Sequence, residues 1–262
     1  MQVSGALYPG QARDRESGEY LGEIKMKHWL EAAGALLYPP RCPVCDELVG
    51  MGVQRMCPAC RRSVRYLSGP LCCKCGKRLS DREAEYCGDC GRVKHLFSAG
   101  RALYEYGDIA PALYRFKYGG RREYAGFFAR EMAQQMGGFI RSLEPGGLVP
   151  VPMYAAKERR RGYNQAALLA RALGRELNIP VFPKLVVRNR NTRPLKSLNS
   201  EERVNNLKKA FNLAQNGVKL KTIILIDDIF TTGSTIDQVS AVLLSGGCQR
   251  VYFATLAIGA GV

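Results

Sequence analysis

Residues 223–235 read Ile-Ile-Leu-Ile-Asp-Asp-Ile-Phe-Thr-Thr-Gly-Ser-Thr. The apolar run that begins one residue earlier, over 222–226, has the length and β-branched content of a buried strand. Asp227 and Asp228 follow at its carboxyl end, and a hydroxyl-rich turn with Gly233 then opens a helix predicted over 234–244. This order of strand, acidic pair, turn and helix is the sharpest signal in the sequence.

The chemistry of the turn suits a phosphate beside a sugar. Free amides at a helix start carry a partial positive charge, and Gly233 lets the backbone approach an anion closely. The carboxylates of Asp227 and Asp228, just before the turn, can accept hydrogen bonds from a sugar diol. The segment therefore suits a ribose with a phosphate on its 5-position. The hydroxyl donors of the turn are Thr231, Thr232, Ser234 and Thr235.

Two other interpretations apply to the same stretch. An apolar strand that ends in two aspartates also occurs beside the phosphate loop of nucleotide hydrolases. The sequence contains no G-x-x-x-x-G-K-[ST] motif, which nearly excludes that class. Alternatively, a Thr or Ser of the turn is a plain helix cap and the two acids are solvated.

The sequence around this stretch alternates between strand and helix patterns. This alternation predicts an α/β fold over 99–262, with a mostly parallel sheet and flanking helices. The predicted strands are 101–106, 147–151, 184–188, 211–213, 222–226 and 250–258. The predicted helices are 109–118, 124–141, 166–177, 200–209 and 234–244.

A cysteine-rich region precedes this domain, over 41–95. Eight of the ten cysteines form four Cys-x-x-Cys pairs, and the pairs repeat at steps of 30 residues. Two pairs bring four thiolates to one ion, which makes a closed, structural zinc site. The most local pairing places Cys42, Cys45, Cys57 and Cys60 on one zinc and Cys72, Cys75, Cys87 and Cys90 on a second.

Other interpretations of the cysteines are weaker. A cross-braced pairing requires longer loop closure. A redox dithiol or an iron–sulfur site does not explain a duplicated 30-residue unit. Cys73 and Cys248 lie outside the pairs and are interpreted as structural residues. The sequence therefore predicts a small duplicated zinc-ribbon domain, which could contact either nucleic acid or protein.

Composition excludes several classes of protein. The chain has 262 residues, of which 46% are hydrophobic and 24% charged, so it is neither collagen-like nor fully disordered. No apolar run approaches the roughly 18 residues that a membrane span needs. Residues 1–25 lack the basic start and apolar centre of a secretory signal. The expected location is therefore the cytoplasm, where cysteines stay reduced.

The start of the chain is predicted to be disordered and then helical. Residues 1–26 lack apolar periodicity, which indicates a disordered leader. The apolar spacing over 27–40 indicates a short amphipathic helix.

The formal net charge is +16, and residues 157–209 alone contain 14 Lys or Arg against four acids. Such a charge faces solvent, phosphate or nucleic acid.

Four stretches carry a family resemblance: Val149-Pro150-Val151-Pro152, Arg159 to Ala166, Arg203 through Asn206, and Asp227 to Thr235. The last resembles the 5-phospho-ribose-1-diphosphate (PRPP) motif of type I phosphoribosyltransferases. With the cysteines, residues 36–258 more narrowly resemble the ComF family, also called ComFC or GntX-like, in which cysteine ribbons precede a phosphoribosyltransferase domain. One departure is Leu195, where the family commonly places Gln.

The resemblance implies a role for each part of the site. Asp227 and Asp228 would hold the ribose hydroxyls of PRPP, and the turn at Met153 and Tyr154 would hold the diphosphate with magnesium. Lys117-Tyr118 resembles a recurrent family feature near the pocket. Catalysis in this class stabilises a cation-like ribosyl centre and the departing diphosphate. The 5-phosphate would be bound by Thr231, Thr232, Gly233, Ser234 and Thr235.

The basic stretch 157–161 has two interpretations. It is either a mobile loop that closes over the diphosphate, with Arg161 as the contact, or a solvated basic loop. His28 and His95 both precede the phosphoribosyltransferase-like domain and are interpreted as surface or packing residues. A Ser-His-Asp or Cys-His nucleophile within that domain is therefore excluded.

Two functions follow from the resemblance. The first is a magnesium-dependent transfer of phosphoribose from PRPP to a nitrogen acceptor. The second is a non-catalytic competence factor that binds single-stranded DNA, with PRPP as a regulatory ligand and a competence-machinery protein as partner. Five basic residues with little aromatic interleaving favour attraction of phosphate over base stacking. They are Lys184, Arg188, Arg190, Arg193 and Lys196.

Overall fold

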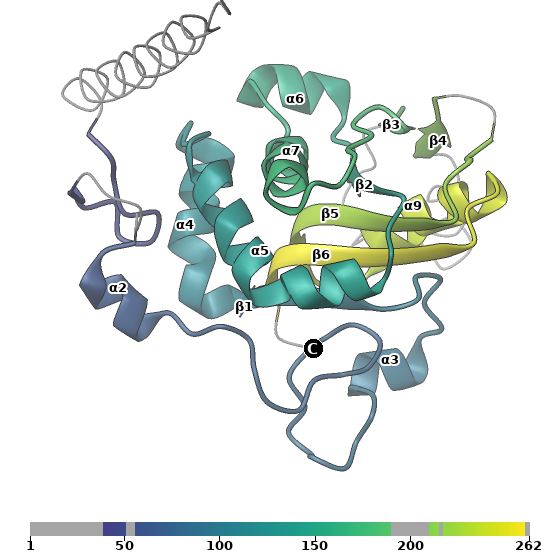
Figure 1. Cartoon of the computed structure of the whole chain (residues 1–262), viewed down its shortest axis with the longest axis horizontal. Helices are drawn as coiled ribbons and strands as arrows, with labels where there is room; N and C mark the ends of the chain where they lie inside the picture. Colours follow the sequence, from purple (N-terminus) through teal and green to yellow (C-terminus); the bar gives the residue numbers. More distant parts are fainter. Residues whose placement is uncertain (1–38, 51–55, 190–209, 215–216, 260–262) are drawn as a thin grey trace, which may run out of the picture. The chain divides into compact units, whose positions relative to one another are not determined.

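The computed structural model describes residues 39–50, 56–189, 210–214 and 217–259 (Figure 1). By their contacts these residues divide into two compact units, one ending at residue 57 and a larger one that runs from residue 58 and includes 43–45. No helix in these described ranges is long and apolar enough to cross a membrane. The predicted helix over 200–209, and residues 27–38 of the predicted helix over 27–40, lie outside the described residues.

A four-stranded parallel sheet forms the centre of the larger unit. Its strands are β1 (Gly100–Glu105), β6 (Arg250–Ile258), β5 (Thr222–Phe230) and β2 (Gly147–Pro150), in that spatial order. Because all four strands run in the same direction, their carboxyl ends meet at one edge of the sheet. Parallel sheets bind ligands at this edge.

The two faces of the sheet are covered by different elements. Ile223 and Leu225 of β5 belong to the core cluster beneath α9 (Ser234–Ser245). Helices α5 (Tyr124–Ser142) and α7 (Gln165–Leu177) pack against each other and against the opposite face (Figure 1). Because helices cover both faces of the sheet, side chains on both sides of β5 are buried. This explains why its apolar residues form a continuous run and do not alternate with polar ones.

The second cysteine repeat shares the core on the α9 side. Cys72 and Cys75 are fully buried and belong to the same cluster as Phe97 and the inner face of the sheet. The short helix α3 (Gly88–Arg92) carries Cys90. This ribbon is therefore packed on the sheet and is part of the larger unit.

Four further elements belong to the larger unit. Helix α4 (Tyr106–Tyr118) follows β1 directly. Strands β3 (Val186–Arg188) and β4 (Phe211–Leu213) form a separate antiparallel pair. Helix α2 (Pro58–Ser63) carries Cys60 of the first cysteine repeat.

Within the described residues, the expectations for the strands and helices between residues 100 and 258 agree with the structure, with two differences. Strand β5 continues to Phe230, so the acidic pair lies within the strand and not after it. The stretch predicted as a basic loop is helix α6 (Ala155–Arg161), which ends at Gly162 with a φ of 85°. Ala, Lys, Glu and Arg are strong helix formers, and a left-handed glycine is a common helix stop.

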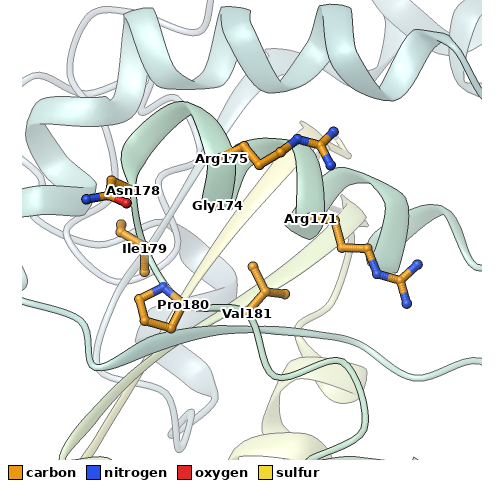
Figure 2. A pocket seen from close by; sticks show the side chains of 7 residues that line it. All are labelled: Arg171, Gly174, Arg175, Asn178, Ile179, Pro180 and Val181. Carbon is orange, nitrogen blue, oxygen red and sulfur yellow. The ribbon is translucent and has the colours of Figure 1, made fainter.

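A surface cavity of about 450 Å³ lies beside α7, away from the acidic pair (Figure 2). Gly174 lets the chain at 179–181 approach the helix, because an added Cβ would lie 2.4 Å from a methyl carbon of Val181. The chain there pairs with Leu148 near the start of β2, at the amino ends of the strands. Arg171 and Arg175 line the cavity mouth, and both are exposed.

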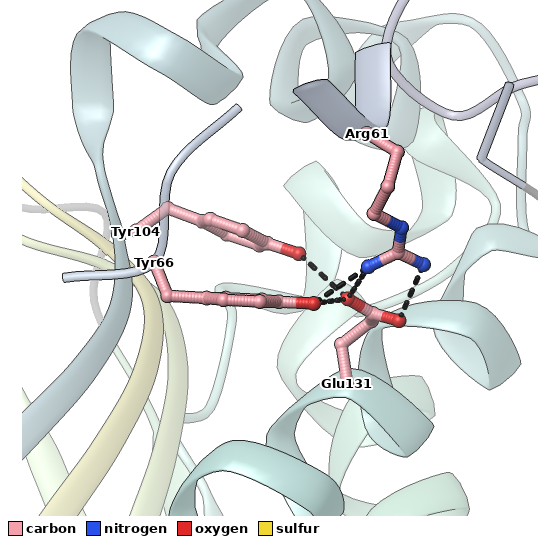
Figure 3. Close-up of polar contacts among 4 residues, drawn as sticks. All are labelled: Arg61, Tyr66, Tyr104 and Glu131. Carbon is pink, nitrogen blue, oxygen red and sulfur yellow. Dashed lines mark hydrogen bonds and ion pairs between the residues drawn. The ribbon is translucent and has the colours of Figure 1, made fainter. Parts of the chain in front are cut away.

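A buried carboxylate joins α2 to α5 (Figure 3). Arg61 donates to both oxygens of Glu131, at 2.8 and 3.0 Å. The hydroxyls of Tyr66 and Tyr104 donate to the same carboxylate, and their rings stack 5.5 Å apart. Burial alone would raise the pKa of Glu131, but the hydrogen bonds from Arg61 and Tyr66 outweigh it and lower the pKa. The charged form of Glu131 therefore stabilises this junction.

Candidate functional site

The acidic pair lies in the second half of β5, toward the carboxyl edge of the sheet. Asp227 accepts a hydrogen bond from the backbone N–H of Asp228 at 2.8 Å. Lys117, one residue from the end of α4, places its Nζ 3.1 Å from Oδ2 of Asp228. Both partners of this ion pair are mostly buried, with side-chain exposures of 20% and 15%. A cation and two carboxylates therefore share one edge of the sheet.

The two carboxylates differ in their surroundings. Burial, and then repulsion from Asp228, raise the pKa of Asp227 well above its ordinary value of 3.8. Lys117 and Arg188 act in the opposite direction, with smaller effects. Asp227 therefore holds a proton more readily than an ordinary aspartate, and Asp228 has the adjacent ammonium group as a counter-charge.

The hydroxyl-rich turn follows the pair directly. Gly233 is the N-cap of α9, with a φ of 80°, a conformation that favours glycine. The hydroxyls of Thr232 and Ser234 lie 2.7 Å apart. Thr231 and Thr232 are exposed, and Thr235 is half-buried in the first turn of the helix. The turn thus presents hydroxyls and helix-start amides beside the two aspartates.

His95 packs beneath this turn. Its Nδ1 lies 2.7 Å from the carboxylate of Asp237 in the first turn of α9. Its side chain is only 2% exposed. The sequence leaves His95 as either a surface or a packing residue, and the structure shows that it is packed. Its contact with Gly233 could not be predicted, because the two residues are 138 positions apart in the chain.

The predicted diphosphate turn begins beside the acidic pair. The N–H of Val151 donates to the carbonyl of Ile226, the residue before Asp227, at 2.9 Å. Asn164, the N-cap of α7, donates to the carbonyl of Val151 at 3.1 Å and fixes the start of the turn. Tyr154 caps α6 and lines a cavity of about 400 Å³. Met153 is half-buried beside it.

The cavity at Tyr154 is basic. Its other side chains come from α6, namely Ala156, Lys157 and Arg160. Arg161 does not line it and instead stacks over the ring of Tyr118, with 4.8 Å between the guanidinium carbon and the ring centroid. The structure therefore brings Lys157 and Arg160 to Tyr154, and Arg161 to the end of α4.

Exposed aromatic rings accompany these basic residues. Tyr114 and Tyr118 lie on α4 with their ring centroids 5.1 Å apart, and they are 65% and 60% exposed. Arg122 lies over Tyr163 at 4.9 Å and donates to the carbonyl of Gly162 at the end of α6. We call Tyr114, Tyr118 and Arg161 the α4–α6 platform.

Arg188 lies near the acidic pair instead of on an open basic face. Its guanidinium stacks over Phe211 at 5.2 Å. Burial lowers its pKa, and the negative charge of Asp227 opposes that effect. Leu195 and the other basic residues predicted beside it, at 190, 193 and 196, lie outside the described residues.

The eight paired cysteines form two groups, as the repeat predicts. Within each group the sulfur atoms lie within 4.8 Å of one another: Cys42, Cys45, Cys57 and Cys60, and Cys72, Cys75, Cys87 and Cys90. A tetrahedral zinc with Zn–S bonds of about 2.3 Å requires sulfur atoms about 3.8 Å apart. The sulfurs of Cys75 and Cys87 are 3.6 Å apart. Four thiolates leave no open position, so both groups are structural zinc sites.

Comparisons with known proteins find similarity in both the cysteine region and the region of the acidic pair. Residues 33–91 match the double zinc ribbon domain, and residues 160–260 match the phosphoribosyl transferase domain. Competence protein F of Haemophilus influenzae is 30% identical over 221 residues, covering 80% of this chain and 93% of that protein. DNA utilization protein YhgH of Escherichia coli is 29% identical, covering 82% and 96%. Competence protein ComFC of Bacillus subtilis is 28% identical, covering 82% and 93%.

Proposed function

Because the chain belongs to the ComF family of competence proteins, with a double zinc ribbon and a phosphoribosyltransferase domain, we propose that it binds PRPP with magnesium and transfers the phosphoribosyl group to a nitrogen acceptor. The observation that carries this proposal is the cluster of Asp227, Asp228 and Lys117 beside the hydroxyl-rich turn. A ribose diol and a 5-phosphate need these two sets of groups next to each other.

Each part of PRPP has a group of matching chemistry. Asp227 and Asp228 accept hydrogen bonds from the ribose hydroxyls. The amides and hydroxyls of residues 231–235 donate to the 5-phosphate. The turn at Met153 and Tyr154, with Lys157 and Arg160 of the adjoining cavity, receives the diphosphate.

The chain's own residues also fit magnesium and the charge changes of the reaction. Carboxylate and diphosphate oxygens are the ligands that magnesium takes in such sites, and Asp227 and Asp228 supply the carboxylates. Bound magnesium would neutralise the charge that develops on the departing diphosphate. Lys117 balances Asp228 before any ligand arrives, so the site is already organised around a fixed positive charge.

Calorimetric titration of the full chain with PRPP and magnesium tests this proposal. We expect saturable binding to one site, and release of diphosphate when the correct nitrogen base from a screen is added. The variant Asp227→Asn/Asp228→Asn should bind PRPP at least a hundredfold more weakly, because two charge-assisted contacts are lost. Unchanged affinity in a variant that keeps its zinc content would overturn the assignment.

The α4–α6 platform favours a second candidate function, the binding of single-stranded DNA in the cytoplasm with PRPP as a regulatory ligand. Two exposed tyrosine rings with an arginine over one of them are typical of surfaces on which bases stack. The names of the relatives, competence and DNA utilization proteins, agree with such a role and with a competence-machinery partner.

A short oligothymidylate titrated at several salt concentrations tests the second function. We expect affinity to fall steeply with salt, and Tyr118→Ala to weaken binding roughly tenfold at every salt concentration, because stacking does not depend on counterions. Tyr106→Ala is the matched control, since Tyr106 is an exposed tyrosine at the other end of α4. Equal weakening by the two variants, or no binding at low salt, would exclude this surface.

A further inference from the structure

The segment 95–97 connects the second cysteine group to the first turn of α9. His95 Nδ1 lies 2.7 Å from Oδ2 of Asp237, and the backbone N–H of Leu96 donates to Oδ1 of the same carboxylate at 2.8 Å. An ionised carboxylate only accepts hydrogen bonds, so Nδ1 of His95 carries the hydrogen. Both oxygens of Asp237 are thereby held by a segment that belongs to the ribbon side of the chain.

The ring of His95 also contacts the hydroxyl-rich turn itself. A Cβ added to Gly233 would lie 2.9 Å from Cε1 of His95, so the ring and the turn are in direct contact. The ring stacks on Phe97 at 4.7 Å, and Phe97 meets Phe230 of β5 edge-on at 5.9 Å. Close-packed interiors transmit displacements, so a shift of His95 moves Gly233.

On its other side the segment is attached to the cysteine ligands. The carbonyl of Lys74, between Cys73 and Cys75, accepts a hydrogen bond from Gly100 at the start of β1 at 2.8 Å. The ammonium group of Lys74 lies 5.4 Å from the ring centroid of Phe97. Cys75 is fully buried in the same core cluster as Phe97. The knuckle between Cys72 and Cys75 therefore touches Phe97, at one end of the segment, and Gly100 just beyond it.

This chain of contacts places the second zinc site and the hydroxyl-rich turn on one continuous packed network. We propose that zinc at Cys72, Cys75, Cys87 and Cys90 and a 5-phosphate at residues 231–235 are thermodynamically coupled, with His95 as the positioning residue between them. The inference rests on the proposed function, because it assumes that the turn holds the 5-phosphate of PRPP. The first zinc site takes no part in the coupling.

Coupling of two ligands is reciprocal, so it has two measurable consequences. Zinc in the second site strengthens binding of the 5-phosphate, and a bound 5-phosphate strengthens binding of that zinc by the same free energy. Because this stabilisation lies in the zinc-bound state, that zinc is released more slowly when the 5-phosphate is bound. Typical coupling between sites changes affinity about tenfold. His95 acts through Asp237 and Gly233 and does not itself contact the ligand.

The test measures zinc release from the full chain to a chromogenic zinc chelator, with and without PRPP and magnesium. We expect PRPP to slow the release of one of the two zinc ions about tenfold and to leave the other unchanged. The unaffected zinc of the same molecule is the internal control. Ribose 5-phosphate should reproduce the effect, and magnesium diphosphate should not, because it lacks the 5-phosphate. This arm requires no variant.

Three variants assign the coupling to His95. His95→Phe keeps a buried ring but loses the donor, and we expect it to abolish the protection of zinc and to weaken PRPP binding about tenfold. His95→Asn keeps a donor near the position of Nδ1 and should restore most of both effects. Lys94→Ala alters an exposed neighbour in the same segment and should change neither. Magnesium diphosphate should bind equally to all of them.

The outcomes separate the inference from the proposed function. If calorimetry detects no PRPP binding to the wild type, the proposed function is wrong. If PRPP binds but slows neither zinc or both equally, the turn binds PRPP and the coupling does not exist. If protection survives in His95→Phe, the coupling does not pass through His95.

Discussion

The ammonium nitrogen of Lys117 lies 3.1 Å from Oδ2 of Asp228, which joins the end of α4 to the acidic pair of β5. The pair is mostly buried and stands where four parallel strands end. Without this cation, two adjacent carboxylates would face a ligand that is itself strongly anionic. Lys117 therefore has an electrostatic role that neither the spacing nor the composition of the sequence indicates.

Replacing Lys117 by Met should weaken PRPP binding roughly tenfold or more, because a charge-assisted contact is lost and Asp228 is left without its counter-charge. Isothermal calorimetry with magnesium present measures the effect. Lys219→Met is the matched control, since Lys219 is exposed and precedes the opposite end of β5. Equal affinities for the two variants would show that the ion pair has no part in binding.

Asp227→Asn should stabilise the ligand-free protein at pH 8. The pKa of Asp227 is raised in the folded state above its ordinary value of 3.8, so its contribution to stability is lost as pH rises above that value. Asn resembles the protonated acid, and we expect a gain of about 1 kcal/mol, reduced by solvent at this half-buried group. Urea unfolding at pH 8 and near pH 4 measures it.

The gain should shrink strongly near pH 4, where the wild-type acid stays protonated in the folded state and is partly protonated in the unfolded state. Asp81→Asn, at an exposed acid, should show no such pH dependence. A variant less stable than the wild type at pH 8 would mean that the charged form of Asp227 is the favoured one in the fold.

The purified protein should contain two zinc ions per chain, and Cys87→Ser should retain one, since a site with three thiolates binds zinc far more weakly. Cys57→Ser should likewise retain one, because it belongs to the other group of four. Elemental analysis counts the metal. One zinc or none in the wild type, or an iron–sulfur chromophore, is the result that would refute the two-site assignment.

Arg61→Ala should destabilise the larger unit by about 3 kcal/mol, because it leaves the buried carboxylate of Glu131 without its bidentate partner. The loss should be largest near neutral pH and shrink as pH falls, since the partners of Glu131 lower its pKa. Chemical denaturation measures the free energy. Arg62→Ala, at the exposed neighbour, is the control and should change it little.

Much of the fold could be predicted because its signals are local. The strand 250–258 was predicted with its observed bounds, since a buried parallel strand is a continuous apolar run. The cysteine groups were predicted because a Cys-x-x-Cys turn fixes two ligands by chain geometry alone. Helix α6 was missed although its residues are strong helix formers, because its high charge was interpreted as a loop.

The site was predictable only in part. Asp227, Asp228 and the turn through Thr235 are consecutive, so one strand and one helix are enough to bring them together. The contact of Arg161 with the diphosphate stays a prediction, but its place over the ring of Tyr118 could not be predicted, because it depends on the stretch being helical. A helix fixes which residues share a face, and a composition-based prediction does not contain that information.

Periodicity and short motifs determine the order of elements and the residues that each one carries, because they depend on neighbours in the chain. They do not determine which elements meet. His95 and Asp237 are 142 residues apart, and Arg61 and Glu131 are 70 apart, yet each pair is in hydrogen-bond contact. Such contacts depend on how helices and ribbons pack on the sheet, and packing of side chains from distant segments is a property of the folded molecule alone.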